Sequence, residues 1–124
     1  MNKNRPKHLA LFKIKLPLPG VVSILHRVSG ILLFLFLPFL LWAFQYSLRS
    51  IETWTILMGY LHLPLLKLVL LGIAWTFFHH LCAGIRYLLL DFHLGSDLPK
   101  ARLSSKLVLV ASLLLTLMTG VMIW

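Results

Sequence analysis

The feature that most constrains the fold of this chain is a set of three long segments without acidic or strongly basic side chains. Aspartate, glutamate, lysine and arginine are absent from residues 28–48, 68–85 and 107–124, and the second segment contains two histidines. Each segment has about the 18 residues that an α-helix needs to cross a hydrocarbon layer some 30 Å thick. The pattern predicts three membrane-spanning helices.

The composition agrees with a membrane environment. Hydrophobic residues make up 60% of the 124 residues and charged residues only 12%, which is too little polar surface for a water-soluble domain of this size. We therefore predict an all-α integral membrane protein with a single membrane-anchor domain over residues 1–124. Its helices are expected at about 21–48, 61–91 and 103–124, because helix ends continue into the headgroup layer, and residues 1–20 form an N-terminal segment.

Proline and serine positions support these boundaries. Pro64 is expected in the first turn of the second helix, where its missing N–H is harmless. Ser104 and Ser105 are candidate N-terminal caps of the third helix. Pro38 falls inside the first helix and should bend it, which membrane helices tolerate.

The positive charges predict the orientation of the helices. Lysine and arginine outnumber the acids by 12 to 3, and they concentrate before the first helix and between the second and third. The other connection carries only Arg49 and Lys67, and the C-terminus carries none. By the positive-inside rule the N-terminus is cytoplasmic and the C-terminus periplasmic.

The same basic residues argue for a membrane partner and against a nucleic-acid one. They lie mostly at the ends of apolar segments, where they anchor to the headgroups of membrane lipids. No basic stripe interleaves with aromatic residues on a polar segment, as nucleic-acid binding would require. The N-terminal segment has neither the apolar core of a secretory signal nor the length of a mitochondrial transit peptide, which favours a bacterial inner membrane.

The first predicted helix begins with a polar cluster, SILHRVSG at residues 23–30. On an α-helix Ser23, His26, Arg27 and Gly30 share one face. Placing an arginine within the membrane costs about 2.5–3.5 kcal/mol on insertion scales, so such a residue normally faces a partner, a cavity or the interface. One interpretation makes His26 and Arg27 cytoplasmic anchors. The other is a pocket whose hydroxyl, imidazole and guanidinium converge on an anionic or carbonyl-bearing ligand.

The second predicted helix contains the adjacent histidines His79 and His80. The positions four and eight residues from His80 include Gly72, Thr76 and Gly84, which form a strip of small residues. Such a strip usually serves close helix–helix packing, but it also suits a flat macrocycle with an imidazole reaching its iron. The two histidines lie about 100° apart around the helix, so at most one faces a given haem. No other histidine is well placed to oppose it, so a second ligand is expected from another subunit.

The end of this helix carries further polar side chains. Arg86 and Asp91 are cytoplasmic boundary charges, expected to pair with each other or with the following connection. Tyr87 lies on the same face as His80, and its hydroxyl can donate a hydrogen bond to a group held there. Cys82 is the only cysteine and is most simply a packing residue. The chain has no acid pair, nucleophile–base arrangement or phosphate-binding glycine loop, which argues against a hydrolase or transferase.

Together these motifs resemble those of the cytochrome b anchor family of succinate dehydrogenase. The resemblance covers essentially the whole chain and rests on Arg5-Pro6, SILHRVSG at residues 23–30, and HxxxGIR from His80, followed by Asp91. It implies a three-helix subunit within a multi-subunit helical bundle. The implied partners are a second small membrane anchor, an iron–sulfur subunit and a flavoprotein. Electrons would pass from the iron–sulfur subunit to ubiquinone, and this chain would do no succinate chemistry.

The resemblance also implies residue roles. His80 would be one axial ligand of haem b, with the second supplied by the partner anchor. Ser23, Ile24 and Arg27 would belong to the ubiquinone site. His26 would approach the haem propionates together with Arg27.

One position departs from the family pattern, and two alternative functions stay open. Tyr87 stands where many family members have a histidine, so a hydrogen-bonding role near the propionates survives but an ionic one does not. The first alternative is the anchor of a fumarate reductase, which runs the same chemistry backwards. The second is a haem-free membrane scaffold or small transporter subunit in which both histidines are packing residues.

Overall fold

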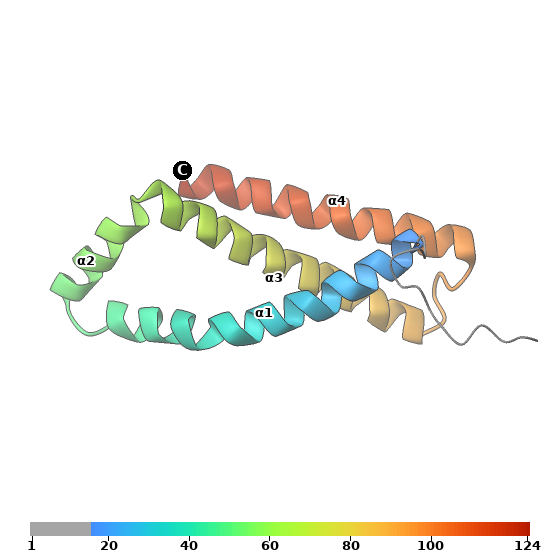
Figure 1. Ribbon diagram of the computed structural model, residues 1–124, viewed down its shortest axis with the longest axis horizontal. Coiled ribbons are helices and arrows are strands. Elements are labelled where there is room, and N and C mark those ends of the chain that lie inside the picture. Colours follow the sequence, from blue (N-terminus) through green and yellow to red (C-terminus); the bar gives the residue numbers. More distant parts are fainter. Residues whose placement is uncertain (1–15) are drawn as a thin grey trace, which may run out of the picture.

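The computed structural model describes residues 16–124, which form four α-helices and no strand. They are α1 (Leu18–Ser47), the short α2 (Ile51–Leu61), α3 (Pro64–Asp91) and α4 (Leu98–Ile123). In Figure 1 the three long helices follow the long axis, with α4 beside α3 and α1 crossing α3. α2 joins α1 to α3 at the end where α4 also terminates. Arg5-Pro6 and the first lysines lie outside the described residues.

The three long helices confirm the predicted fold class. α1, α3 and α4 are each long and apolar enough to cross a membrane. Within a bilayer such helices satisfy their backbone hydrogen bonds internally, which is why uninterrupted apolar segments become helices there. Pro38 lies inside α1 and Pro64 lies in the first turn of α3, as predicted.

The predicted start of the last helix is wrong by about one turn. α4 begins at Leu98, with Asp97 at its N-cap and a proline in its first turn. Ser104 and Ser105 therefore lie inside the helix and do not cap it. Both hydroxyls donate back to the carbonyl of Ala101, at 3.1 and 2.8 Å, a local bond that serines make within helices. The first helix likewise begins at Leu18, three residues before the predicted boundary at about 21.

The connection between the first two spans contains a helix that the charge pattern did not predict. α2 starts at a reciprocal cap: Ser50 Oγ accepts from the N–H of Thr53 at 3.1 Å, and Thr53 Oγ1 accepts from the N–H of Ser50 at 3.0 Å. Glu52 lies in the first turn, where a negative charge favours the helix dipole. The serine three residues before a threonine was the available signal.

The packing of the described residues is the inverse of that in a water-soluble protein. Large apolar side chains point outward, and Phe34 and Val121 are 74% and 83% exposed. The buried side chains are mostly small or polar: Val22, Ser29, Thr76, His79, Ala83, Arg86, Ser105, Val108, Ser112 and Thr116. Because lipid tails solvate leucine as well as a protein core does, membrane helices associate through small residues that let their backbones approach.

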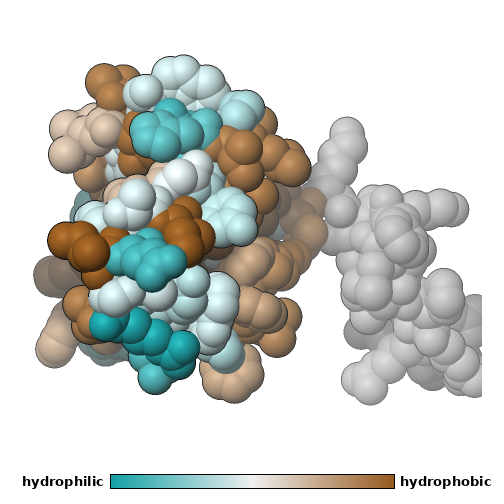
Figure 2. Space-filling model, turned by 90° about the vertical axis from the view of Figure 1, so that its left-hand side faces the viewer, coloured by the Kyte–Doolittle hydropathy of each residue, from teal (hydrophilic) through white to brown (hydrophobic). Residues whose placement is uncertain are grey.

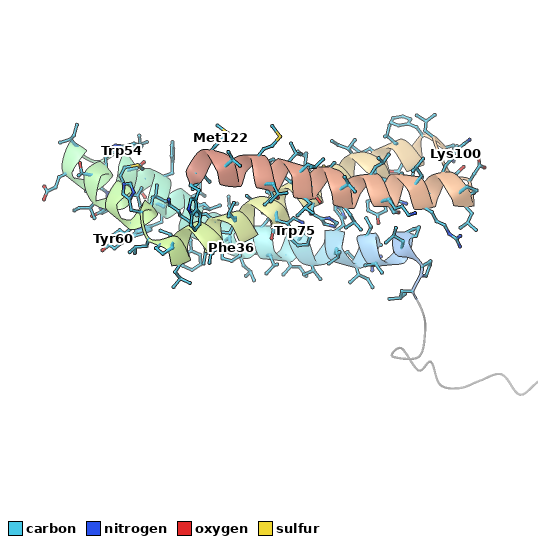
Figure 3. The ribbon with its side chains drawn as sticks, turned by 90° about the horizontal axis from the view of Figure 1, so that it is seen from above. Phe36, Trp54, Tyr60, Trp75, Lys100 and Met122 are labelled. Carbon is cyan, nitrogen blue, oxygen red and sulfur yellow. The ribbon has the colours of Figure 1, made fainter. Side chains whose placement is uncertain are left out.

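Polar and amphipathic side chains mark the two ends of the molecule. Trp54 and Tyr60 lie at the α2 end, and Lys100 lies at the opposite end (Figure 3). At the α2 end Lys67 Nζ is 5.1 Å from the centre of the Trp124 ring. Viewed onto that end, patches of hydrophilic residues lie among residues of intermediate hydropathy, with hydrophobic residues between them and at the flanks (Figure 2). Helices that cross a hydrocarbon layer with their ends among headgroups have this distribution.

Candidate functional site

The polar residues of α1 and α3 meet around the imidazole of His80. Its Nδ1 lies 3.1 Å from Ser29 Oγ and 3.1 Å from the carbonyl oxygen of His26. The hydroxyl of Ser29 donates to the same carbonyl at 2.8 Å. Because a carbonyl only accepts and the serine proton is already engaged, both contacts assign the imidazole proton to Nδ1. Nε2 of His80 then carries the lone pair.

That second nitrogen is available for a ligand. Nε2 of His80 makes no hydrogen bond within residues 16–124, and the side chain is only half-buried. Among residues 16–124, the buried ring nitrogens without a hydrogen-bond partner are those of His79, and Nε2 of His80 is not one of them. A neutral imidazole with Nδ1–H held by a carbonyl and Nε2 free is the usual metal-binding form. The environment of His80 therefore fits an axial ligand of haem.

His79 has the opposite environment. Its side chain is 0% exposed, and its ring stacks on Trp75 with 5.3 Å between ring centroids. Neither nitrogen has a hydrogen-bond partner among residues 16–124. A macrocycle would reach this ring only if the helices separated. The adjacent histidines thus divide into one that is enclosed and one that is accessible.

Two glycines allow α1 and α3 to approach at this point. A Cβ on Gly30 would lie 3.0 Å from Cε1 of His80, and a Cβ on Gly84 would lie 3.6 Å from Nε2 of His26. The two imidazoles stack nearly parallel, with centroids 4.3 Å apart and planes inclined by 11°. Because its ring stacks flat on that of His80, His26 would not be the second ligand of a haem held by His80. Gly84 serves contact between helices, whereas Gly72 has no such neighbour within 4 Å.

The other residues of the first polar cluster lie on a more open side of α1. Ile24 and Arg27 are exposed and Ser23 is half-buried. Of the residues predicted to share a face, His26 and Gly30 lie against His80 of α3, whereas Arg27 is exposed. Within residues 16–124 the side chains of Ser23 and Arg27 make no hydrogen bond or ion pair. A hydroxyl and a guanidinium are therefore open to a ligand here.

Tyr87 extends the polar cluster toward the end of α3. Its ring centroid is 5.2 Å from that of His26, at an angle of 50°. The hydroxyl is buried and has no partner among the described residues. A buried hydroxyl without a hydrogen bond costs about 1–3 kcal/mol. This environment fits a further polar group beside Tyr87.

Arg86 and Asp91, predicted as boundary charges, lie in different environments. Arg86 is buried and donates from Nε to Ser104 Oγ at 2.9 Å, and from Nη2 to the carbonyl of Ala101 at 3.4 Å. Asp91 is exposed at the end of α3 and makes no ion pair within residues 16–124. Five helical residues rotate the chain by about 140°, so the two side chains cannot share a face.

Comparison with known proteins decides the family. A family model described as the succinate dehydrogenase/fumarate reductase transmembrane subunit matches residues 1–119. The chain belongs to this family. It is accordingly a multi-pass membrane protein, and the resemblance predicted from SILHRVSG and HxxxGIR is confirmed. Membership favours a respiratory subunit over the small transporter subunit, and the alternative of a haem-free scaffold stays a prediction.

Individual relatives extend over nearly the whole chain. A protein of Coxiella burnetii is 34% identical over 125 residues, which cover 100% of both chains. One of Rickettsia felis is 30% identical over 92% of this chain and 87% of its own. One of Paracoccus denitrificans is 28% identical over 94% and 89%. All three relatives are named succinate dehydrogenase cytochrome b556 subunit.

Proposed function

We propose that this chain is the cytochrome b anchor of a bacterial succinate dehydrogenase. It would bind haem b and form part of the site at which ubiquinone is reduced, and so link the tricarboxylic acid cycle to the respiratory chain. The observation that carries the proposal is the environment of His80, whose Nδ1 is held by Ser29 and His26 while Nε2 stays free. The names of the relatives support the same assignment.

The residues around His80 would hold the haem. His80 would ligate the iron through Nε2, and a second axial ligand would come from the partner anchor subunit, since His26 is stacked and His79 enclosed. A haem with two imidazole ligands supplies one-electron transfer. His26, Arg27 and Tyr87 would be the nearby polar contacts for its propionates.

The open side of α1 would form part of the quinone site. The guanidinium of Arg27 and the hydroxyl of Ser23 would donate to quinone oxygens, which become more negative on reduction, so these contacts would strengthen as the reaction proceeds. Ile24 is 46% exposed and would offer an apolar surface to the ring. A quinone bound here would lie near the proposed haem, because His26, one residue from Arg27, stacks on the proposed haem ligand His80.

The proposed partners follow from the orientation. The start of α1, the end of α3 and the start of α4 lie at one end of the molecule (Figure 1), and this end carries Arg27, Lys100 and Arg102. The positive-inside rule makes it cytoplasmic, with the C-terminus periplasmic and the chain in a bacterial inner membrane. The iron–sulfur subunit and flavoprotein would dock on that side, beside a second small membrane anchor.

Copurification with optical spectroscopy tests this proposal. The chain, tagged and extracted in mild detergent, should bring the flavoprotein, the iron–sulfur subunit and a second anchor, and a dithionite-reduced minus oxidised spectrum should show a b-type haem. A complete complex without that signal would contradict the haem assignment, and the absence of the two soluble subunits would contradict the whole proposal. The family description also covers fumarate reductase. Extraction of ubiquinone with the complex, rather than a lower-potential quinone, would favour succinate oxidation.

A further inference from the structure

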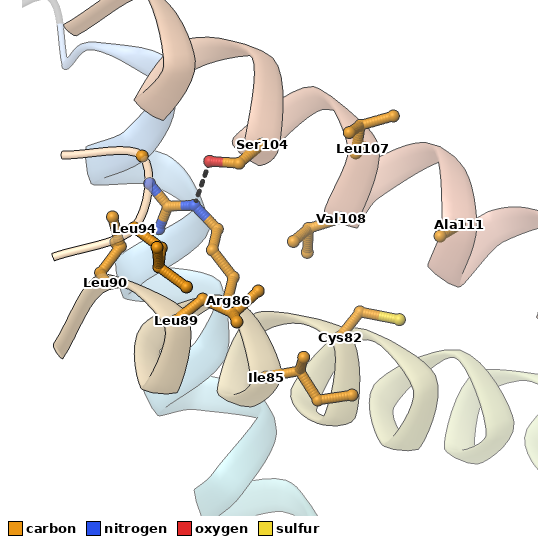
Figure 4. Close-up of a pocket in the computed structure, with 11 residues that line it drawn as sticks. Cys82, Ile85, Arg86, Leu89, Leu90, Leu94, Ser104, Leu107, Val108 and Ala111 are labelled. Atoms are coloured by element: carbon orange, nitrogen blue, oxygen red, sulfur yellow. Dashed lines mark hydrogen bonds between the residues drawn. The ribbon is translucent and has the colours of Figure 1, made fainter. Parts of the chain in front are cut away.

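A cavity of about 300 Å³ lies between α3 and α4 on the side of α3 away from His80. The residues of α3 that line it include Cys82, Ile85 and Leu89, which are about 140–200° around the helix from His80. The wall from α4 is apolar at Leu107, Val108 and Ala111 and polar at Ser104 (Figure 4). This cavity is therefore separate from the proposed haem and quinone sites.

One end of the cavity is formed by a buried guanidinium without a counter-charge. Arg86 is 6% exposed, its two hydrogen-bond acceptors, Ser104 Oγ and the carbonyl of Ala101, are neutral, and its guanidinium carbon lies 5.3 Å from the centre of the Tyr87 ring. Within residues 16–124 the ion pair that forms is between Lys100 and Asp97, so no carboxylate neutralises Arg86. Most of the N–H donors of the guanidinium have no partner in the described chain. Burial of an uncompensated charge is unfavourable, so this end of the cavity favours an anion.

The position of Arg86 along the helix indicates which anion is at hand. It lies five residues before the end of α3, or about 7.5 Å along the axis. Figure 4 shows its tip beside Leu90 and Leu94, toward the connection to α4. A long cationic side chain at such a place reaches the headgroup layer of a bilayer.

The walls indicate what accompanies that anion. Ile85 and Leu107 are 51% and 59% exposed, so the cavity opens onto the apolar surface that faces lipid. An occupant must combine an anionic group at Arg86 with an alkyl chain along these residues. A phospholipid has this chemistry, and the exposed Arg102 and Lys106 on α4 favour one whose headgroup carries a net negative charge.

We propose that the groove between α3 and α4 binds one anionic phospholipid. Its phosphate accepts hydrogen bonds from the unpaired N–H groups of Arg86, and one acyl chain lies along Ile85, Leu107 and Ala111. The site needs neither haem nor quinone, so it stands independently of the proposed function. Its volume lies at the lower end of the range of about 300–1,000 Å³ for small-molecule pockets, which suits one chain and part of a headgroup.

Native mass spectrometry of the full chain with its copurifying subunits tests the proposal. After delipidation, the sample is titrated with phosphatidylglycerol or phosphatidylcholine of identical acyl chains. The wild type should bind one phosphatidylglycerol more than the variants do, and should favour it over phosphatidylcholine by about tenfold. Arg86→Gln removes a charged donor and should weaken phosphatidylglycerol binding by about ten- to a hundredfold. The matched control Arg49→Gln removes an exposed cation at the α2 end, away from the cavity, and should change it by less than about threefold.

A second variant separates the acyl-chain site from the folding role of Arg86. Ala111→Phe fills the cavity, leaves the Arg86–Ser104 bond in place and should weaken both lipids by about tenfold or more. If Arg86→Gln does not assemble with the other subunits, Ala111→Phe still tests the proposal. Unchanged phosphatidylglycerol binding in Ala111→Phe would overturn the proposal. So would equal affinity for the two lipids, or displacement by millimolar inorganic phosphate, which would indicate a free-anion site. Loss of a partner subunit from Ala111→Phe with no lipid on the wild type would assign the groove to that subunit.

Discussion

The two interfaces that α3 makes differ in what holds them together. Against α4, the buried hydroxyls of Ser105, Ser112 and Thr116 each donate to a carbonyl of their own helix, so the contact there is mainly close packing of small groups. Against α1, the His80 imidazole bonds across to Ser29 and to a backbone carbonyl. Buried polarity alone therefore does not mark function in a membrane helix. What distinguishes the two sides is whether the hydrogen bonds cross between helices.

Arg86 is the exception on the α4 side, because its guanidinium crosses to Ser104. The bond leaves the charge without a carboxylate in the described chain, and the cavity begins there. Hydrogen bonds that cross between helices thus single out both candidate sites. One faces α1 and the other faces α4.

The largest expected effect is loss of the haem signal when His80, which bonds across the α1–α3 interface, is replaced. His80→Ala removes the proposed ligand and should abolish or convert to high spin the b-type signal in the reduced minus oxidised spectrum. His79→Leu should keep the signal, because its ring nitrogens have no hydrogen-bond partner among residues 16–124 and an apolar side chain fits the enclosed site. Loss of haem from the leucine variant with retention in the alanine variant would reverse the assignment of the two histidines.

The next effect concerns the open side of α1. Arg27→Ala should lower succinate–ubiquinone reductase activity by about ten- to a hundredfold, because the variant loses a charged hydrogen bond to the quinone. Succinate oxidation with an artificial acceptor should persist, since the flavoprotein is untouched. Arg49→Ala, at the α2 end, is the control and should leave both rates unchanged. Equal quinone reduction by the wild type and Arg27→Ala would make Arg27 only a headgroup anchor.

A smaller effect is expected where the helices approach most closely. In Gly30→Ala the new methyl group would lie 3.0 Å from Cε1 of His80. The ring cannot easily move because Nδ1 is bonded to α1, so overpacking should lower stability by about 1–3 kcal/mol and perturb the haem spectrum. Gly72→Ala meets nothing within 4 Å and should stabilise its helix by up to about 1 kcal/mol. Thermal unfolding in detergent measures both, and equal midpoints would mean that the α1–α3 contact is looser than described.

The smallest effect compares two serines directly. Ser29→Ala removes one of two acceptors of His80 Nδ1 and should lower the free energy of unfolding by about 0.5–1.5 kcal/mol, with haem retained. Ser112→Ala removes only a bond to the carbonyl of Leu109 in its own helix and should be neutral or slightly stabilising. Denaturation in mixed micelles would compare them. A larger loss for Ser112→Ala would show that both interfaces depend on hydroxyl groups.

Much of the fold followed from the sequence because it depends on local chemistry. Charge-free segments of membrane-spanning length are helices whatever their neighbours, since a bilayer leaves the backbone no other partner. The position of Pro64 and the small residues near His80 could also be interpreted locally. The start of α4 could not be predicted locally, because serine hydroxyls bond to the backbone both at helix caps and inside helices. Ser104 and Ser105 do so inside α4. α2 was missed because its charge-free run, residues 53–66, is shorter than a membrane span.

For the candidate site too, the spacing of residues in the sequence predicted one part and the packing of the helices decided the rest. Sequence spacing placed Ser23, His26 and Arg27 on one side of a helix, but helix packing decided that His26 stacks on His80 of α3 while Arg27 stays exposed. Spacing also put Arg86 near Asp91 in the chain, whereas packing sent its side chain to α4.

The sequence by itself determined that this chain consists of membrane-spanning helices with polar side chains near one end, because hydrophobicity and charge act residue by residue. It also contained the motifs that place the chain in its family. Only the tertiary structure decided that His79 is enclosed, that Nε2 of His80 is free, and that Arg86 lies at one end of a cavity. Those properties depend on how α1 and α4 pack against α3, and the approach of two helices is not encoded in the spacing of either one.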